Sequence, residues 1–312
     1  MLFTEVNSKL GSPFLSILHG HPSVELAAVV TSPPGRLCSY FTDDDAAVDV
    51  ERQARALGVP VLRPASVNDP EVAQELAALA PDYFLVGNFQ QLIREHLLDL
   101  PREAAVNFHP SPLPEFAGLA PFYWMVREGA RNSAVSVIEM GRKLDDGHLL
   151  MQHQVPLSGR ETGLELRTMQ ERANVLMLLE LIPELVGRSF TRTPQDLASR
   201  SYYGRPQEDD YRLDFTLPAA VVERHVRAAY RHPGAWFTTA GGQRIRVLSA
   251  ECGGPSPHPV AEPPGTLLRY DHELYVACAD GWLRLVTVEC GEREVPVTDP
   301  AFALAGHEIS AR

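Results

Sequence analysis

Residues 104–114 read AAVNFHPSPLP, and this stretch decides how the first part of the chain folds. Its apolar start is typical of a buried strand, and its proline-rich end is rigid. His109 is therefore delivered where the strand ends. Asn107 lies two residues earlier, and alternate residues of a strand point to the same side. The stretch predicts a strand whose carboxyl end presents an amide and an imidazole together.

A second polar run, LDDG at residues 144–147, adds carboxylates to this pair. An amide can hold a developing oxyanion, and an imidazole that titrates near about pH 6.5 can exchange protons. A carboxylate can orient the imidazole or accept a proton from an incoming amine. Together these groups suit the movement of an acyl group between two amines. Asp145 and Asp146 are adjacent, so the residues alone do not choose between them.

Each of these residues also has a plainer interpretation. His109 is one of eleven histidines, and a histidine is more often a surface or core residue than a catalytic one. Asn107 is a common turn residue after a strand, and the Asp pair can simply open a turn before Gly147. No phosphate loop, paired CxxC or HExxH motif elsewhere in the sequence competes with the acyl-transfer interpretation.

Short apolar runs alternate with helical stretches through the first two hundred residues. This β-α-β rhythm indicates an α/β domain with a doubly wound, mostly parallel sheet and helices on both faces. Active groups then belong at the carboxyl ends of the strands, where His109 falls. Strands are predicted at 1–6, 24–31, 59–62, 83–87, 104–108 and 134–140, and helices at 11–20, 45–57, 119–130 and 165–187, with another opening at residues 68–70.

The rhythm changes after about residue 205. A polar link at 204–210 leads to a helix at 217–230. Short strands broken by Gly and Pro follow, which suggests a small open barrel. Two domains are expected, at 1–204 and 205–312. The strands of the barrel are predicted at 235–239, 244–250, 265–269, 274–279 and 283–288.

The composition narrows the class of protein. The chain has 312 residues, is 45% hydrophobic and carries a formal net charge of −12, which argues against a broad nucleic-acid surface. The four cysteines are scattered without the spacing of metal ligands and suit thiols in a reducing cytosol. The sequence has neither a signal peptide nor a run of about 18 apolar residues. A soluble, cytoplasmic protein without a membrane partner is expected.

The pattern Asn107-x-His109-x-Ser111-x-x-Pro114, followed by Leu144-Asp145-x-Gly147, resembles that of the 10-formyltetrahydrofolate-dependent formyltransferases. Both halves and their separation match. The resemblance implies a Rossmann-like catalytic domain followed by an OB-like domain, N10-formyltetrahydrofolate as formyl donor, and no metal. It also selects Asp145 over Asp146 as the carboxylate of a catalytic triad with Asn107 and His109.

The resemblance further implies which residues bind the donor and the acceptor. Main-chain groups of a first loop would read the pterin ring and a second loop would close over it, although without the resemblance the first loop would pass for a plain strand–helix turn. Ser111 and Pro114 would form a rigid wall of the acceptor pocket, with Tyr123 beside it; Tyr123 could equally be a core residue of its helix. The two pterin loops contribute Phe89, Gln90, Gln91, Leu92 and Ile93, and Glu139, Met140, Gly141 and Leu144.

Two departures from the family pattern bear on the acceptor. Ala117 stands where relatives usually carry an arginine, which removes a cation. Asp43, Asp44 and Asp45 form an acidic run where the transfer-RNA formyltransferases have a basic loop, and such a run would repel phosphates. A small amine, free or bound to a carrier protein, is therefore expected rather than a nucleic acid. The barrel would then shape the pocket rim or support a homodimer. Methionyl-tRNA formyltransferase and formyltetrahydrofolate hydrolase remain the alternatives.

Overall fold

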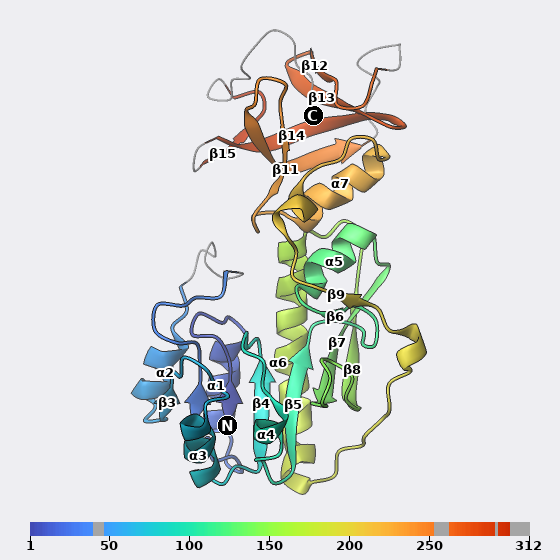
Figure 1. Ribbon diagram of the computed structural model, residues 1–312. Helices are drawn as coiled ribbons and strands as arrows, with labels where there is room; N and C mark the ends of the chain where they lie inside the picture. The colour runs from blue at the N-terminus through green and yellow to red at the C-terminus, as the bar shows by residue number, and fades with distance from the viewer. Residues whose placement is uncertain (40–46, 253–261, 291–292, 300–312) are drawn as a thin grey trace. The chain divides into compact units, whose positions relative to one another are not determined.

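The computed structural model describes residues 1–39, 47–252, 262–290 and 293–299 (Figure 1). The chain divides into two compact units, each built from several segments. The first unit comprises 1–121, 132–156 and 167–203, and the second comprises 122–131, 157–166 and 204–312. The division into domains between residues 204 and 205 stays a prediction.

A seven-stranded sheet forms the centre of the first unit. Its five neighbours β3, β2, β1, β4 and β5 run parallel, and the last two, β7 and β8, are antiparallel. The predicted fold class, a doubly wound and mostly parallel sheet, is thereby confirmed. In sheet order the strands are β3 (Val61–Leu62), β2 (Val29–Val30), β1 (Leu2–Phe3), β4 (Tyr83–Gly87), β5 (Ala104–His109), β7 (Asn132–Glu139) and β8 (Leu149–Pro156).

Helices connect the parallel strands and cover the sheet (Figure 1). Asp69 is the N-cap of α3 and Pro70 opens it, as a proline at the first helical position should. Phe3 and Phe84 lie in the core, with ring centroids 4.7 Å apart. The helices are α1 (Gly11–Gly20), α2 (Val50–Ala56), α3 (Pro70–Ala78), α4 (Glu95–Leu98) and α6 (Gly163–Gly187), whose first turn belongs to the second unit.

Two very short strands complete the first unit. β6 (Ala117–Gly118) and β9 (Tyr202–Tyr203) pair in parallel, although they lie far apart in the sequence. A 3₁₀ turn, η2 (Leu197–Ser199), precedes β9. This pairing fastens the segment after α6 to the loop that follows β5.

The second unit carries an antiparallel sheet, as the sequence predicted for the C-terminal part. Its order is β10, β11, β14, β13 and β12, and β15 pairs with β14 as a strand that the sequence did not reveal. Among the described helices, none is long and apolar enough to cross a membrane. The elements are α5 (Pro121–Glu128), η3 (Glu208–Tyr211), α7 (Ala219–Ala228), β10 (Ala235–Thr238), β11 (Arg244–Cys252), β12 (Leu267–Tyr270), β13 (Glu273–Cys278), β14 (Gly281–Cys290) and β15 (Arg293–Pro296).

Candidate active site

His109 is the last residue of β5, and only 6% of it is exposed. It lies opposite Ser136 of β7, and Asn107 lies opposite Ile138. Because Asn107 and His109 are two residues apart in a strand, their side chains leave the same face of the sheet. Asn107 is half-buried. The carboxyl end of β5 thus presents the amide and the imidazole side by side.

Asp145 completes this arrangement from a loop between β7 and β8. Its Oδ1 lies 3.6 Å from Nδ1 of His109, and the two side chains are 11% and 7% exposed. Its Oδ2 accepts a hydrogen bond from the backbone nitrogen of Gly118 at 2.8 Å. The φ of Asp145 is +54°, in the left-handed region that few residues other than glycine adopt. Such a conformation persists only where surrounding contacts hold it.

The neighbour Asp146 points elsewhere. A β-carbon on Gly141 would lie 2.6 Å from its Oδ1, so this carboxylate packs against the start of the same loop. A β-carbon on Gly147 would clash with the carbonyl oxygen of Glu139. The glycine of the Leu-Asp-x-Gly motif is therefore required by a close approach of two backbone segments. Of the two aspartates, Asp145 is the one in contact with the imidazole.

The other edge of the imidazole faces the loop after β5. Nε2 of His109 lies 3.5 Å from the carbonyl oxygen of Phe116, whose φ is +53°. The Phe116 ring stacks on Tyr203, with centroids 5.3 Å apart and planes 11° from parallel. Gly118 has a φ of +103°, and a β-carbon there would clash with the Tyr203 carbonyl. Both ring nitrogens of His109 therefore face oxygen atoms, a carboxylate and a carbonyl, to which an imidazolium can donate.

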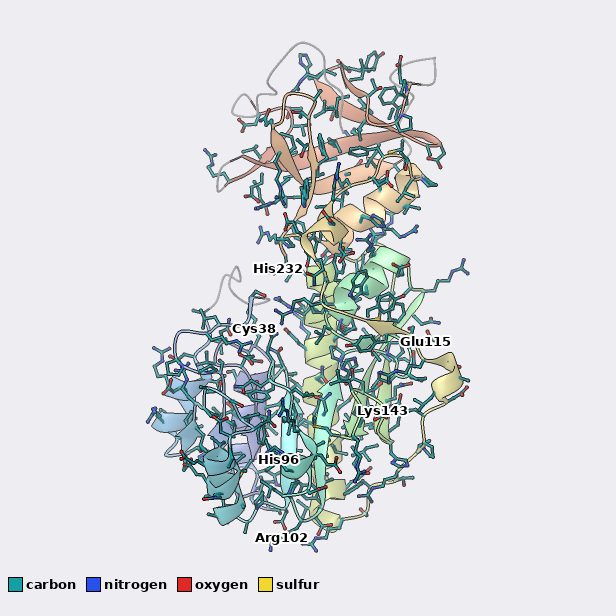
Figure 2. The ribbon with its side chains drawn as sticks, in the orientation of Figure 1. Cys38, His96, Arg102, Glu115, Lys143 and His232 are labelled. Atoms are coloured by element: carbon teal, nitrogen blue, oxygen red, sulfur yellow. The ribbon has the colours of Figure 1, made fainter. Side chains whose placement is uncertain are left out.

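A buried polar network holds the proline-rich loop that follows His109. The Ser136 hydroxyl donates to the Ser111 carbonyl at 2.6 Å and accepts from the backbone nitrogen of Leu113 at 3.1 Å. The Gln152 amide donates to the Ser136 hydroxyl and to the Leu113 carbonyl, both at 2.9 Å. The loop then runs to Glu115, which is labelled in Figure 2. Satisfied buried hydrogen bonds of this kind fix a single loop conformation.

The first predicted pterin segment, residues 89–93, follows β4. Phe89 packs edge-on against Phe3, and Ile93 is buried with 4% exposure. The backbone nitrogen of Gln90 donates to the Glu5 carboxylate at 2.8 Å. The Gln91 side chain accepts from the backbone of Val67, while Leu92 is 57% exposed. This segment is thus pinned at several points and leaves one leucine side chain open to solvent.

The second predicted segment meets the first in the core. Met140 packs against the same buried cluster as Phe89 and Ile93. The carboxylate of Glu139 accepts two hydrogen bonds from Arg192, at 2.7 and 2.9 Å. Leu144 is 48% exposed. The structure therefore brings the two segments together, and the binding of the pterin by them stays a prediction.

The residues predicted to bind the acceptor substrate lie in different surroundings. Ser111 is fully buried and donates to the Glu115 carbonyl at 3.1 Å, and Pro114 is half-buried in the same loop. Tyr123 belongs to the second unit, where its hydroxyl donates to the Asp210 carbonyl at 2.7 Å. Burial raises the pKa of Tyr123 to about 12. Its surroundings are those of a core residue, and its contact with an acceptor stays a prediction.

Two residues that hold these loops from elsewhere in the chain were not found from the sequence. Glu5 is 1% exposed at the end of β1 and fixes the backbone at Gln90; a lone acid within an apolar run was the available signal. Gln195 donates to the carbonyls of Asp145 at 3.0 Å and Gly147 at 2.7 Å. It lies outside both motifs, so no local pattern pointed to it.

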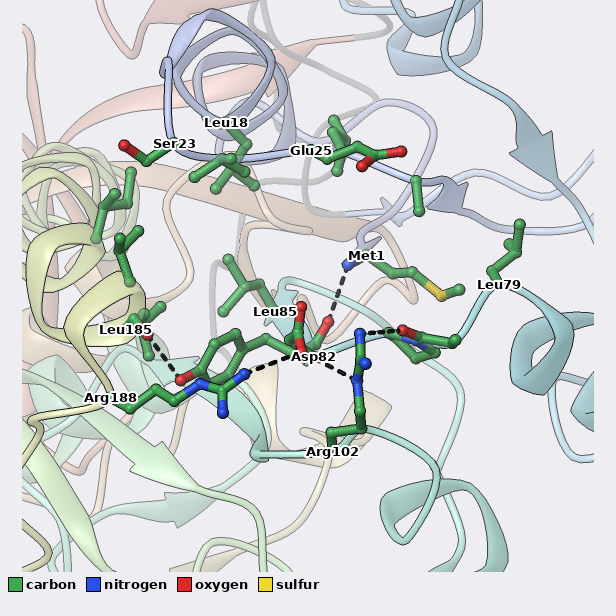
Figure 3. Close-up of a pocket in the computed structure, with 18 residues that line it drawn as sticks. Met1, Leu18, Ser23, Glu25, Leu79, Asp82, Leu85, Arg102, Leu185 and Arg188 are labelled. Carbon is green, nitrogen blue, oxygen red and sulfur yellow. Dashed lines mark hydrogen bonds and ion pairs between the residues drawn. The ribbon is translucent and has the colours of Figure 1, made fainter.

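A cavity of about 430 Å³ lies at the amino ends of the strands in the seven-stranded sheet, at the end opposite to His109 (Figure 3). Its wall combines apolar side chains of α1, β4 and α6 with Asp82, Arg102 and Arg188. Asp82 Oδ1 lies 3.0 Å from Nε of Arg102 and 3.6 Å from the Arg188 guanidinium. Asp82 thus faces two cations, and Arg188 also pairs with Glu103 at 2.9 Å. Arg102, labelled in Figure 2, precedes β5, so the cavity is separated from His109 by the length of that strand.

Two further expectations concern charge. Within the described ranges, no group of three or more His, Cys, Asp or Glu side chains is arranged to hold a metal ion. The acidic run of Asp43, Asp44 and Asp45 lies outside the residues that the structure describes.

Comparison with known proteins places this geometry in a family. The family model described as formyl transferase matches residues 3–182, and that described as formyl transferase, C-terminal domain, matches residues 206–301. The methionyl-tRNA formyltransferase of Ectopseudomonas mendocina is 35% identical over 241 residues, covering 77% of this chain and 75% of that protein. That of Myxococcus xanthus is 33% identical over 290 residues, covering 92% and 89%.

Solved structures share the fold at lower identity. The N-formyltransferase of Helicobacter canadensis, in complex with folinic acid and dTDP-3-aminofucose, has a TM-score of 0.69 at 14% identity and covers 92% of this chain and 99% of that one. HypX of Aquifex aeolicus, in complex with tetrahydrofolic acid, has a TM-score of 0.61 at 16% identity and covers 95% and 45%. With both family models matched and the motif residues gathered at the end of β5, the chain belongs to the formyl transferase family.

Proposed function

We propose that the enzyme transfers a formyl group from N10-formyltetrahydrofolate to the primary amine or hydroxylamine of a small molecule, free or bound to a carrier protein. The observation that carries this proposal is the pairing of His109 with Asp145 beside Asn107, at the carboxyl end of β5. Ligands of open α/β sheets bind outside the carboxyl ends of the strands.

The chemistry assigns one role to each group. The acceptor nitrogen attacks the formyl carbon, and the carbonyl oxygen becomes an oxyanion that the Asn107 amide and the His109 imidazolium stabilise. Asp145 accepts the proton that the amine loses, directly or through water, and orients the imidazole. When the bond between the formyl carbon and N10 breaks, the leaving nitrogen takes the proton that Asp145 accepted, passed on by the His109 imidazolium or by water. Formyl and proton transfers balance without a covalent enzyme intermediate.

The donor assignment is supported by the loops that flank the triad. Residues 89–93 and 139–144 share one buried cluster, to which Ile93 belongs and against which Phe89 and Met140 pack. Each of these loops exposes one leucine, Leu92 or Leu144, that can pack on a flat ring. The Glu5 carboxylate and the Gln91 side chain hold the first loop by hydrogen bonds to and from backbone. Folinic acid and tetrahydrofolic acid, which occupy two structural relatives, are chemically close to the proposed donor.

The acceptor assignment is supported by charge. The chain carries a net charge of −12 and three consecutive aspartates at 43–45. Ala117, where a cation is usual in the family pattern, is fully buried. A nucleic-acid acceptor relies on Lys and Arg contacts with phosphates, and these features work against such contacts. A small amine needs only space beside His109.

A second candidate, methionyl-tRNA formyltransferase, is favoured by the sequence relatives, which are methionyl-tRNA formyltransferases 31–35% identical to this chain. The two candidates differ in the size and charge of the acceptor. The test supplies the enzyme and N10-formyltetrahydrofolate with a panel of primary amines and hydroxylamines, and separately with charged initiator methionyl-tRNA at physiological salt.

The products are read by mass, and the released tetrahydrofolate is measured in parallel. We expect formylated small amines and no more than trace formyl-methionyl-tRNA. Efficient formylation of the tRNA would instead establish the second candidate. Release of tetrahydrofolate and formate at the same rate with and without every acceptor would indicate a hydrolase.

A further inference from the structure

A single irregular segment after α6, residues 192–203, contacts both loops that meet at His109; we call it the strap. At its start Arg192 makes the bidentate pair with Glu139. Thr193 then exchanges two backbone hydrogen bonds with Leu149, at 2.8 and 2.9 Å. The loop that carries Asp145 runs from the end of β7 to the start of β8. The strap therefore forms hydrogen bonds at both ends of this loop.

The middle of the strap forms hydrogen bonds with the turn of the same loop. Nε2 of Gln195 donates to the carbonyls of Asp145 and Gly147, at 3.0 and 2.7 Å. The Arg200 guanidinium donates to the Leu144 carbonyl at 2.8 Å. Three carbonyls around the left-handed residue Asp145 are thus satisfied by two strap side chains. Oε1 of Gln195 is itself buried without a hydrogen-bond partner within the described part of the chain.

The end of the strap forms hydrogen bonds with the other loop, which follows β5. The Ser201 hydroxyl accepts a hydrogen bond from the backbone nitrogen of Phe116 at 2.8 Å. The backbone carbonyl of Ser201 accepts one from the backbone nitrogen of Ala117 at 2.9 Å. The Tyr203 carbonyl accepts from Leu119 at 2.9 Å. This second loop supplies two backbone groups that contact the triad: the Phe116 carbonyl beside His109 and the Gly118 amide on Asp145.

We propose that the strap sets the distance between Asp145 and His109, and that Gln195 is its principal positioning residue. Without the two donations from Gln195, the turn at Asp145 relaxes out of its left-handed conformation, and the carboxylate leaves the imidazole and the Gly118 amide. A displacement of about 1 Å at a catalytic group lowers the rate of the chemical step about 100-fold. The inference rests on the proposed function for its kinetic part and on geometry alone for the rest.

The test uses the full chain and three variants. Gln195→Met keeps the length of the side chain and removes both donations. Gln195→Glu replaces the donor by a carboxylate, which faces two carbonyl oxygens and donates only when it is protonated. Ser199→Ala is the matched control, because this exposed serine of the strap donates only to Asp196, at 3.1 Å, within the strap itself.

The first measurement needs no substrate. Hydrogen exchange at the Gly118 amide reports whether Asp145 Oδ2 is in place, because this oxygen is its acceptor. We expect exchange at least about tenfold faster in Gln195→Met than in the wild-type enzyme, and unchanged exchange in Ser199→Ala. Equal Gly118 exchange in Gln195→Met and Ser199→Ala would overturn the proposal whether or not an acceptor has been found.

The second measurement is kinetic, with the best amine of the panel. We expect kcat of Gln195→Met to fall about 10- to 100-fold with both KM values within about twofold. In Gln195→Glu, kcat relative to wild type should rise as the pH is lowered, because protonation restores one donation; a merely structural role gives a constant ratio. A pH-independent ratio or an unchanged kcat contradicts the inference. A wild-type enzyme that formylates none of the amines contradicts the proposed function instead, and leaves the exchange measurement decisive for the strap.

Discussion

Asp145 links the two loops of the site because its carboxylate oxygens have different partners. One faces Nδ1 of His109 and the other accepts from the Gly118 amide. Asp146, one residue later, turns its carboxylate toward Gly141. Neighbouring aspartates therefore have different surroundings, and this difference makes the assignment of Asp145 testable by one matched pair of substitutions.

Asp145→Asn should lower kcat at least about 100-fold, because the amide keeps the shape of the carboxylate but loses its charge and its basicity. Asp146→Asn should stay within about threefold of the wild-type value. Binding of a tetrahydrofolate analogue, measured by calorimetry, should change little in both. We expect Asn107→Ala and His109→Ala to resemble Asp145→Asn. A larger loss in Asp146→Asn would shift the motif by one residue.

Gly147→Ala should disturb the same loop by steric means. The added methyl group would meet the Glu139 carbonyl, so the backbone around residue 147 must move. We expect a loss of about 1–3 kcal/mol in the free energy of unfolding, the usual cost of forcing a group into a packed site. Activity should fall with it. Gly20→Ala, at a helix end with open space around it, is the control and should unfold like wild type.

At the scale of elements, the sequence predicted the helices and strands whose bounds are marked by residues close together in the chain. The helix at 11–20 and the strand at 83–87 have the predicted bounds, because apolar spacing and turn residues mark both. β8 was missed because its residues 152–154 are all polar and its inner face is only half-buried. β6 and β9 exist only through pairing between residues 117–118 and 202–203, which no local periodicity records.

The candidate site follows the same division. His109 and Asn107 could be placed together from the alternation of a single strand. Asp145 could be chosen only through the family pattern, since adjacent aspartates look alike in sequence. Gln195 could not be found at all, because its role depends on two carbonyls about fifty residues earlier in the chain. Sequence therefore predicted the groups to which the proposed chemistry is assigned, but not the residues that hold them in place.

Helix α7 makes the stability of the second unit depend on pH. Burial, with the nearby cations Arg127 and Arg224, lowers the pKa of His225 to about 4. The pKa of a histidine in an unfolded chain is about 6.5. Between about pH 4 and pH 6.5 the unfolded chain therefore binds a proton at His225 more tightly than the folded chain does. The contribution of His225 to stability is therefore complete above about pH 6.5 and is lost as the pH falls toward about 4.

Calorimetric unfolding of the wild type and of His225→Gln at pH 7.5 and pH 4.5 checks this sign. We expect the wild-type midpoint to fall by about 3 °C more than that of the variant, a shift typical of about 1 kcal/mol in a domain of this size. Carboxylates that titrate in the same range affect both proteins and cancel in the comparison. An equal fall in both midpoints would show that His225 is not the group responsible.

At the scale of the whole molecule, the two units interleave along the chain. The helix α5 was expected within the N-terminal domain, yet its residues group with the second unit. There the Tyr123 hydroxyl donates to the Asp210 carbonyl, the Arg127 guanidinium donates to the same oxygen, and Arg227 donates to the Glu161 carbonyl. Residues 122–131 and 157–166 thus depend on partners that follow residue 204.

A chain shortened after residue 204 should therefore be less stable than the full chain. It would keep the sheet of the first unit but leave the Tyr123 hydroxyl without its acceptor at Asp210, and it would remove most of the unit in which Met125 and Leu166 are buried. We expect a midpoint of thermal unfolding at least about 5 °C lower and a tendency to aggregate. Adding residues 205–312 as a separate chain should reverse part of this loss. A shortened chain with an unchanged midpoint would show that the first 204 residues fold independently.

The interleaving also sets an order of events during synthesis. A ribosome adds about 5–20 residues per second, so residues 204–312 emerge over roughly 5–20 s after β9 has left the tunnel. Throughout that interval the sheet carrying His109 can already close, since all its strands have been made, whereas α5 waits with its apolar face uncovered. The nascent chain therefore holds a complete parallel sheet while α5 stays without its later partners, until the last strands arrive.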